Sequence, residues 1–202
     1  MGEGFDPPDE RLVLLAKDGS LDAFNRLVDR YQGAVYSLCF RLLGNREAAE
    51  DATQESFLSA YRALERFDGG NLRSWLLRIA ANQSKDELRR RRRKDAVASL
   101  NEMFDREDAP VEVPDAGAGP DTLVMRAELG EDMEALLMEL PLEQRQAIVL
   151  VDIYDFAYEE VARITGSSVG TIKSRIHRGR ERLRNLVLSS PELSAAIRRL
   201  GR

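Results

Sequence analysis

Apolar residues recur along most of the chain every three or four positions, the spacing of α-helices with one buried face. The clearest such stretch covers residues 20–43, with Ser20 as a plausible N-cap and Gly44 as the residue that ends the helix. Its apolar positions are Phe24, Leu27, Val28, Tyr31, Val35, Leu38 and Leu42. This stretch therefore predicts a long amphipathic helix.

Three more helices are predicted around it. Asn45 and Asn71 can cap two following helices, the second running from Leu72 to about Lys94, and a shorter helix precedes them at about 9–17. The glycines of Asp68-Gly-Gly break the chain before the last helix. Together the four helices predict one compact helical domain, residues 8–94.

The segment 95–127 differs in composition. Between residues 95 and 122 it holds eight acidic residues and one basic residue, and it contains Pro110, Pro114 and Pro120. Such a composition is typical of a flexible acidic linker, with at most a short helical turn at 98–104.

Helical periodicity returns after the linker. It predicts a second domain at 128–188 and a tail at 189–202, where Ser190-Pro191 resembles the start of a short helix. The expected fold is all-α: two small helical domains joined by the linker.

The second domain contains a helix-turn-helix pattern over 158–177. Ala162 is small where two helices must approach closely, and Gly166 permits the positive φ of the turn. The inward stripes of the two helices are Val161 and Ile164, then Val169, Ile172, Ile176 and Leu183. Opposite them the second helix carries polar and basic residues suited to a major groove. An ordinary helical hairpin with a solvated basic face is the alternative. Gly179, in the middle of that helix, suggests close packing.

The helix that starts at Leu72 has a basic face. Arg78, Asn82, Lys85, Arg89 and Arg92 recur at spacings of three and four, as expected of side chains that follow phosphates and reach base edges. Two alternatives stay open: Trp75 can equally be a core residue, and the run Arg89-Arg-Arg-Arg-Arg-Lys94 can simply stay solvated at a helix C-terminus.

Composition and charge narrow the function classes. The 202 residues are 43% hydrophobic and carry a formal net charge of −5, but the basic residues cluster in the two helices just described, and a phosphate backbone responds to local potential. No apolar run long enough to span a membrane and no signal pattern occurs, so a soluble, cytoplasmic protein is expected. With one cysteine, Cys39, and one histidine, His177, neither an internal disulfide nor a Cys/His zinc site is expected, and no cofactor.

Four motifs resemble one family. They are Asp51-Ala-Thr-Gln-Glu-Ser-Phe57, the segment Phe67-Asp-Gly-Gly-Asn-Leu-Arg-Ser-Trp-Leu-Leu-Arg-Ile-Ala-Ala-Asn82, Tyr158-Glu-Glu-Val-Ala and Gly170-Thr-Ile-Lys-Ser-Arg-Ile-His-Arg178. In this order and spacing the chain resembles the extracytoplasmic-function sigma factors, the smallest members of the sigma-70 class. The resemblance implies a factor that directs RNA polymerase to promoters and catalyses no reaction itself, so it is not an enzyme.

The resemblance also implies roles for matching residues. Docking on the polymerase clamp would use Asp51, Gln54, Glu55 and Phe57. Binding of the minus-ten element, with one base turned out into a pocket at the loop before the basic helix, would use Asn71, Arg73, Trp75, Arg78, Asn82, Lys85 and Arg89. Major-groove binding at the minus-thirty-five element would use Thr171, Lys173, Ser174, Arg175, His177 and Arg178. Asp86 and Glu87 place acids just after the expected base-reading positions.

The implied partners are core RNA polymerase, through its β′ clamp and its β subunit, promoter DNA and an anti-sigma factor, often a membrane-bound one, with no small-molecule substrate. Two rival functions would each require a different sequence feature. A polymerase-independent helix-turn-helix regulator would need an apolar dimer seam where residues 45–67 are acid-rich. A metal-dependent nuclease would need rigidly held ligands, whereas the acids of 115–122 lie in the predicted linker.

Overall fold

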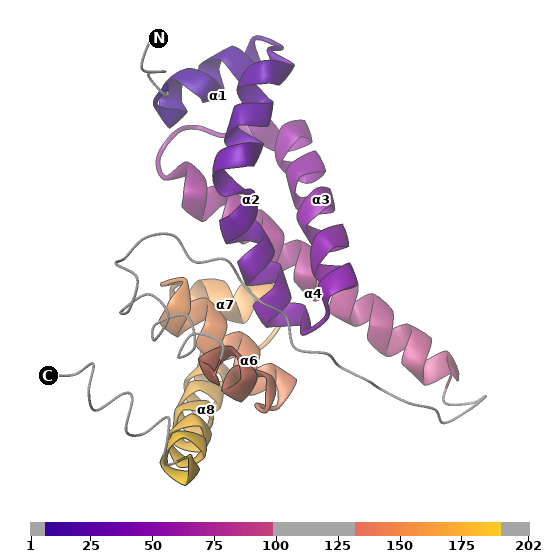
Figure 1. The fold of residues 1–202 in the computed structure, drawn as a ribbon, viewed down its shortest axis with the longest axis vertical. Helices are drawn as coiled ribbons and strands as arrows, with labels where there is room; N and C mark the ends of the chain where they lie inside the picture. Colours follow the sequence, from indigo (N-terminus) through magenta and orange to yellow (C-terminus); the bar gives the residue numbers. More distant parts are fainter. Residues whose placement is uncertain (1–6, 99–131, 191–202) are drawn as a thin grey trace, which may run out of the picture. The chain divides into compact units, whose positions relative to one another are not determined.

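The computed structural model describes residues 7–98 and 132–190 of the chain (Figure 1). The chain divides into two compact units, Met1–Glu102 and Met103–Arg202. Every regular element within the described residues is helical, which confirms the predicted all-α class. Most of the predicted linker, the predicted turn at 98–104 and the tail helix expected after Ser190 lie outside the described residues.

The first unit is built from four α-helices and a 3₁₀ turn. They are α1 (Asp9–Lys17), α2 (Leu21–Leu43), α3 (Arg46–Ala63), the turn η1 (Leu64–Arg66) and α4 (Leu72–Ala98). The helix α4 continues past Lys94, where the sequence had suggested its end, so the first four residues assigned to the linker are helical.

Side-chain caps set the helix starts where the sequence predicted them. The Ser20 hydroxyl accepts a hydrogen bond from the Ala23 amide at 3.3 Å, and the side-chain Oδ1 of Asn45 accepts one from the Ala48 amide at 2.9 Å. Each satisfies an amide of the first helical turn that has no partner inside the helix. Gly44 ends α2 in the left-handed conformation, at φ 66°. These local signals therefore fix the boundaries of α2 and α3.

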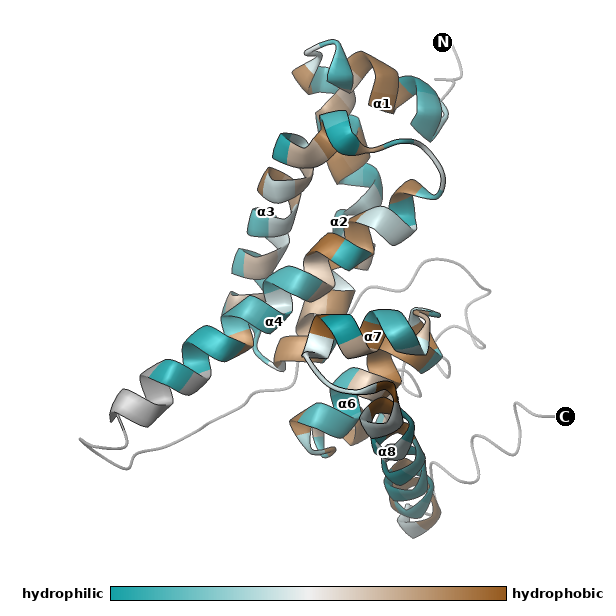
Figure 2. Cartoon of the chain, turned by 180° about the vertical axis from the view of Figure 1, so that it is seen from behind, coloured by the Kyte–Doolittle hydropathy of each residue, from teal (hydrophilic) through white to brown (hydrophobic). Residues whose placement is uncertain are grey.

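The helix α2 forms the centre of this unit and packs against α1, α3 and α4. Leu12, Leu38, Leu42 and Leu77 are almost completely buried between these helices. Burial of one such side chain contributes about 1.5–3 kcal/mol. The far part of α4 is mostly hydrophilic (Figure 2).

The second unit holds shorter helices. Residues 132–138 are helical, and they are followed by α6 (Leu142–Ile148), a π-helical turn η2 (Val149–Ile153), α7 (Tyr158–Thr165) and α8 (Val169–Ser189). The helix α8 packs against both α6 and α7. Val161, Ala162, Ile164, Ile172 and Ile176 are buried, which confirms the predicted helix-turn-helix faces.

Two glycines have defined roles in this unit. Gly166 ends α7 at φ 66°, as predicted for the turn. Gly179 is buried in α8, and a Cβ atom there would lie 2.5 Å from Ile148 Cδ1 and 3.3 Å from Gln144 Cβ. The suspected close packing is confirmed: α8 and α6 approach closely at Gly179, where a side chain would not fit without a shift of Ile148.

Among the described helices, none combines the length and the apolarity needed to cross a membrane.

Candidate nucleic-acid interfaces

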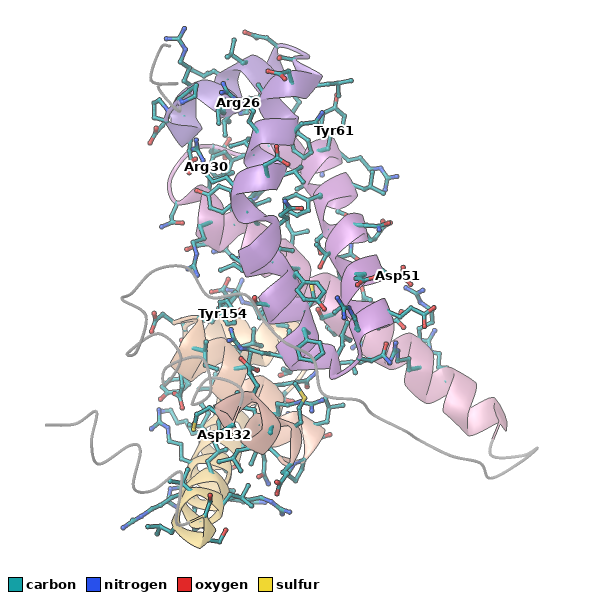
Figure 3. All side chains as sticks on the ribbon, viewed as in Figure 1. Arg26, Arg30, Asp51, Tyr61, Asp132 and Tyr154 are labelled. Carbon is teal, nitrogen blue, oxygen red and sulfur yellow. The ribbon has the colours of Figure 1, made fainter. Side chains whose placement is uncertain are left out.

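The outer face of α3 carries acidic, amide and apolar side chains. Asp51, Gln54 and Glu55 are exposed, and Leu58 and Tyr61 continue the face with 51% and 41% of their surfaces exposed. Figure 3 shows Asp51 and Tyr61 near opposite ends of this helix. The exposed stripe is therefore long, and it mixes charge with apolar area, as protein-binding surfaces do.

Phe57 does not belong to this face. Its side chain is only 8% exposed and packs in the core of the first unit. One residue further along, a helix turns by about 100°, so the exposed apolar residue is Leu58 instead. The resemblance had placed Phe57 among the clamp-docking residues, and its burial corrects that assignment: Phe57 holds α3 in place.

The loop before α4, residues 68–71, is exposed and has an unusual backbone. Gly69 and Gly70 both have positive φ, 97° and 87°, a conformation that residues with a Cβ rarely adopt. At its end, the side-chain Oδ1 of Asn71 accepts a hydrogen bond from the Ser74 amide at 2.8 Å, which confirms Asn71 as the cap of α4. At its start, the Phe67 ring packs on Trp75, with 5.1 Å between ring centroids.

A groove of about 930 Å³ lies between this loop and α1. Its lining carries both signs of charge, Asp9, Glu10 and Asp68 against Lys17 and Arg73, together with the ring of Tyr31. An open groove with an aromatic ring and hydrogen-bonding groups of both kinds can hold a nucleobase.

Hydrogen bonds fix both ends of α1 beside this groove. Lys17 Nζ donates a hydrogen bond to the Phe67 carbonyl oxygen at 2.7 Å. Asp9 accepts hydrogen bonds from the Tyr31 hydroxyl and from Arg30, which Figure 3 labels on α2. Burial, aided by the bond to Asp9, raises the pKa of Tyr31 to about 12, so the phenol stays protonated as a donor.

The basic face of α4 follows the loop directly. Arg78, Asn82 and Arg89 are exposed and Lys85 is half-buried, so these four predicted minus-ten residues share one accessible stripe. Trp75 is half-buried against Phe67, which agrees in part with each of its two interpretations.

Acids in α4 pair with its own arginines. Glu87 lies 3.1 Å from Arg90 and 2.9 Å from Arg91, and Asp86 lies 3.9 Å from Arg89. Arg91 also reaches the Asn45 cap of α3, at 3.4 Å. These contacts give Asp86 and Glu87 a structural role: they offset the repulsion between adjacent arginines.

In the second unit, α8 presents the predicted recognition face. Lys173, His177 and Arg178 are exposed, and Thr171 and Ser174 are half-buried at the start of the helix. Ser168 caps α8 by accepting a hydrogen bond from the Thr171 amide at 3.1 Å. The Lys173 ammonium lies 6.0 Å from the centre of the Tyr158 ring, a cation–π contact between α8 and the start of α7.

Arg175 is held inside its own unit. Its guanidinium donates to Ser167 Oγ at 2.7 Å and to Glu143 Oε2 at 3.0 Å, and only 21% of its side chain is exposed. The predicted role of Arg175 in the major groove therefore conflicts with its position: it links the turn of the helix-turn-helix to α6.

Arg180 is a second link that the sequence did not reveal. It makes two hydrogen bonds to Asp152, at 2.9 and 2.6 Å, and Asp152 raises the pKa of the guanidinium. Asp152 lies in the π-helical turn η2, and no helical spacing pairs it with α8.

Comparison with known proteins identifies the family. The family models Sigma-70 region 2 and Sigma-70 region 4 match residues 27–94 and 130–183. The SigW sigma factor of Bacillus subtilis is 36% identical over 183 residues, which cover 87% of this chain and 94% of SigW. The chain belongs to the extracytoplasmic-function sigma factors. The sigma-E factor of Escherichia coli K12 is 38% identical over 89% of the chain and 94% of its own length. The SigE factor of Mycolicibacterium smegmatis is 39% identical over 82% of the chain, which spans only 62% of that protein.

Two solved structures share the fold of this sigma factor. One is the RpoE sigma factor with the anti-sigma factor NepR from Bartonella quintana, at TM-score 0.60 and 28% identity over 83% of this chain and 98% of that one. The other is CnrH with the cytosolic domain of CnrY, at TM-score 0.52 and 26% identity over 90% and 98%.

The sigma factor's groove uses residues that sequence reasoning missed. Asp9 and Lys17 lie on α1, before the region 2 match begins, and no motif singled them out. Within the described residues, no cluster of three or more His, Cys, Asp or Glu side chains could hold a metal ion.

Proposed function

We propose that this sigma factor binds core RNA polymerase and directs it to promoters that carry a minus-ten and a minus-thirty-five element. The observation that carries the proposal is the joint likeness to sigma-70 regions 2 and 4, each of which coincides with a helical unit that exposes a basic helix face. The chain itself catalyses no reaction: the polymerase supplies the chemistry, and a factor with this role works in the cytoplasm.

In the first unit, the loop and α4 bind the non-template strand of the minus-ten element. One base turns out into the groove beside Tyr31 and Arg73, and the next nucleotides follow Arg78, Asn82 and Arg89 along α4. Stacking and cationic contacts bind single strands without a regular duplex, and their binding energy offsets the cost of opening the promoter.

In the second unit, α8 enters the major groove of the minus-thirty-five element. Lys173, His177 and Arg178 are the exposed side chains near its start, where a recognition helix contacts base edges. Arg175, with Glu143 and Ser167, holds this helix at the angle that the contacts require.

The outer face of α3 docks on the clamp of the polymerase. Asp51 and Glu55 complement a basic partner, and Leu58 and Tyr61 supply apolar area. An acidic, exposed face supports this role over a polymerase-independent regulator, whose dimer seam would be mainly apolar. An anti-sigma factor that covers such surfaces is the expected inhibitor.

Run-off transcription with purified core polymerase and fragments of the host genome tests the proposal. We expect initiation only when the sigma factor is added. Absence of initiation that depends on it would refute the proposal.

Arg178→Ala should lower initiation from promoters with a minus-thirty-five element by about tenfold, which corresponds to the loss of one good base contact. Arg184→Ala removes the same charge from an exposed position further along α8, about 120° around the helix, and should change little.

A further inference from the structure

Lys17, the last residue of α1, contacts the backbone at the start of the loop before α4, residues 68–71. Lys17 Nζ lies 2.7 Å from the Phe67 carbonyl oxygen and 3.5 Å from the Glu65 carbonyl oxygen, across about fifty residues of sequence. Glu65 lies within η1 and Phe67 directly follows it, where the 3₁₀ turn opens into the loop. A charged donor to a carbonyl is one of the stronger hydrogen bonds in proteins.

The loop needs such an anchor. Residues 68–71 are all exposed, and the two glycines at its tip gain no rigidity from side chains. Its far end is fixed by the cap that Asn71 gives to α4, and its near end by Lys17 and by the Phe67 ring on Trp75. With both ends held, the freedom of the loop is confined to its tip.

The opposite end of α1 is fixed as well. Asp9 is hydrogen-bonded to Arg30 and Tyr31 on α2. The inner face of α1, made of Leu12, Val13 and Ala16, is buried in the core. The helix α1 is therefore a rigid wall of the groove, and Lys17 connects that wall to the loop that faces it.

We propose that Lys17 is a positioning residue for the minus-ten element: by holding the Phe67 carbonyl it sets the width of the groove that receives the flipped base. This inference rests on the proposed function, because it presumes that the groove holds a base. It goes beyond the family match, which begins at residue 27 and leaves α1 without a role.

The test compares three variants in complex with core polymerase. Lys17→Met removes the charge and keeps the length, Lys17→Arg keeps a charged donor, and Arg11→Met removes the same charge from an exposed position of α1. The affinity of each holoenzyme is measured for a promoter with a pre-melted minus-ten region, and for copies with an abasic site at each position of the non-template strand.

Lys17→Met should weaken binding to the intact strand by about tenfold, comparable to one charge-assisted hydrogen bond. At one abasic position, which lacks the captured base, Lys17→Met and the wild type should bind equally. Lys17→Arg should retain most of the affinity, and Arg11→Met should match the wild type. Core binding should be unchanged in all three, and Lys17→Met should lower the thermal stability of the first unit slightly, because the hydrogen bond to the Phe67 carbonyl oxygen is lost.

Two results would overturn the inference about Lys17 and leave the proposed function intact. One is that Lys17→Met loses the same factor on every abasic strand, which would make its effect purely structural. The other is that Lys17→Met behaves like Arg11→Met on the intact strand. If instead no abasic position weakens the wild type, base capture itself is absent, and the proposed use of the groove falls together with the inference.

Discussion

At the residue scale, Gly179 shows how packing can reverse a helix propensity. Alanine in the middle of a helix is normally more stable than glycine by about 1 kcal/mol. At Gly179 the added Cβ would meet Ile148 Cδ1 at 2.5 Å, and such overpacking costs about 1–3 kcal/mol. We expect Gly179→Ala to lower the free energy of unfolding of the second unit by about 1 kcal/mol in urea titrations.

Gly33 is the matched control, because it also lies inside a helix, α2. A Cβ there would meet nothing within 4 Å. Gly33→Ala should therefore raise the free energy of unfolding of the first unit by about 0.5–1 kcal/mol. Equal effects of the two substitutions would show that α6 and α8 do not need the close approach.

Residue roles divide into those that the sequence could predict and those that it could not. Helical spacing assigned the buried stripe of α8 and its exposed face correctly, because a face depends only on the 100° step. Spacing cannot tell which long side chain folds back onto its own domain. Arg175 and Arg180 do so because Glu143 and Asp152 lie opposite them, and those contacts depend on how α6 and η2 pack.

At the element scale, α3 offers a test of the docking face. Leu58→Ala should lower the affinity for core polymerase by about tenfold, because burial of an exposed leucine side chain in an interface contributes about 1.5–3 kcal/mol. Leu21→Ala makes the same change at a side chain that is 60% exposed on α2, and it should leave the affinity unchanged. Titration of labelled sigma factor with core polymerase measures both.

Phe57→Ala should differ from Leu58→Ala in kind. Phe57 is buried, so its truncation should cost about 3–5 kcal/mol of stability and reduce core binding only through loss of folded protein. A folded Phe57→Ala variant with weak core binding would instead restore Phe57 to the docking face.

Helix starts were predictable at this scale and helix ends less so. Ser20, Asn45 and Asn71 are local signals, and all three cap helices as predicted. The end of α4 had no such signal: the arginine run favours a helix C-terminus, yet Glu87 pairs with Arg90 and Arg91, and the helix continues to Ala98. A pocket at the loop was expected, but the part that α1 plays in lining it was not predictable, because α1 and the loop are separated by about fifty residues of sequence.

At the scale of the whole molecule, the net charge of −5 conceals two basic surfaces on separate units. We expect each surface to bind DNA weakly alone, because each offers only a few exposed side chains for base contacts. When both surfaces are held on one chain that is bound to polymerase, binding of the second surface becomes intramolecular. The joint affinity for DNA should then exceed the affinity of either surface alone by about a hundredfold or more. The connection between the units is therefore part of the proposed function.

A cut in the predicted linker tests this coupling. A protease site inserted between residues 110 and 120, cleaved after the holoenzyme has formed, should lower initiation from promoters that require both elements by about a hundredfold. The first unit keeps its clamp face and its loop, so binding to core polymerase should survive the cut. A chain with an uncleavable version of the inserted site is the control. Full initiation after complete cleavage would mean that the polymerase alone holds the two units together, and that the covalent connection adds nothing to promoter recognition.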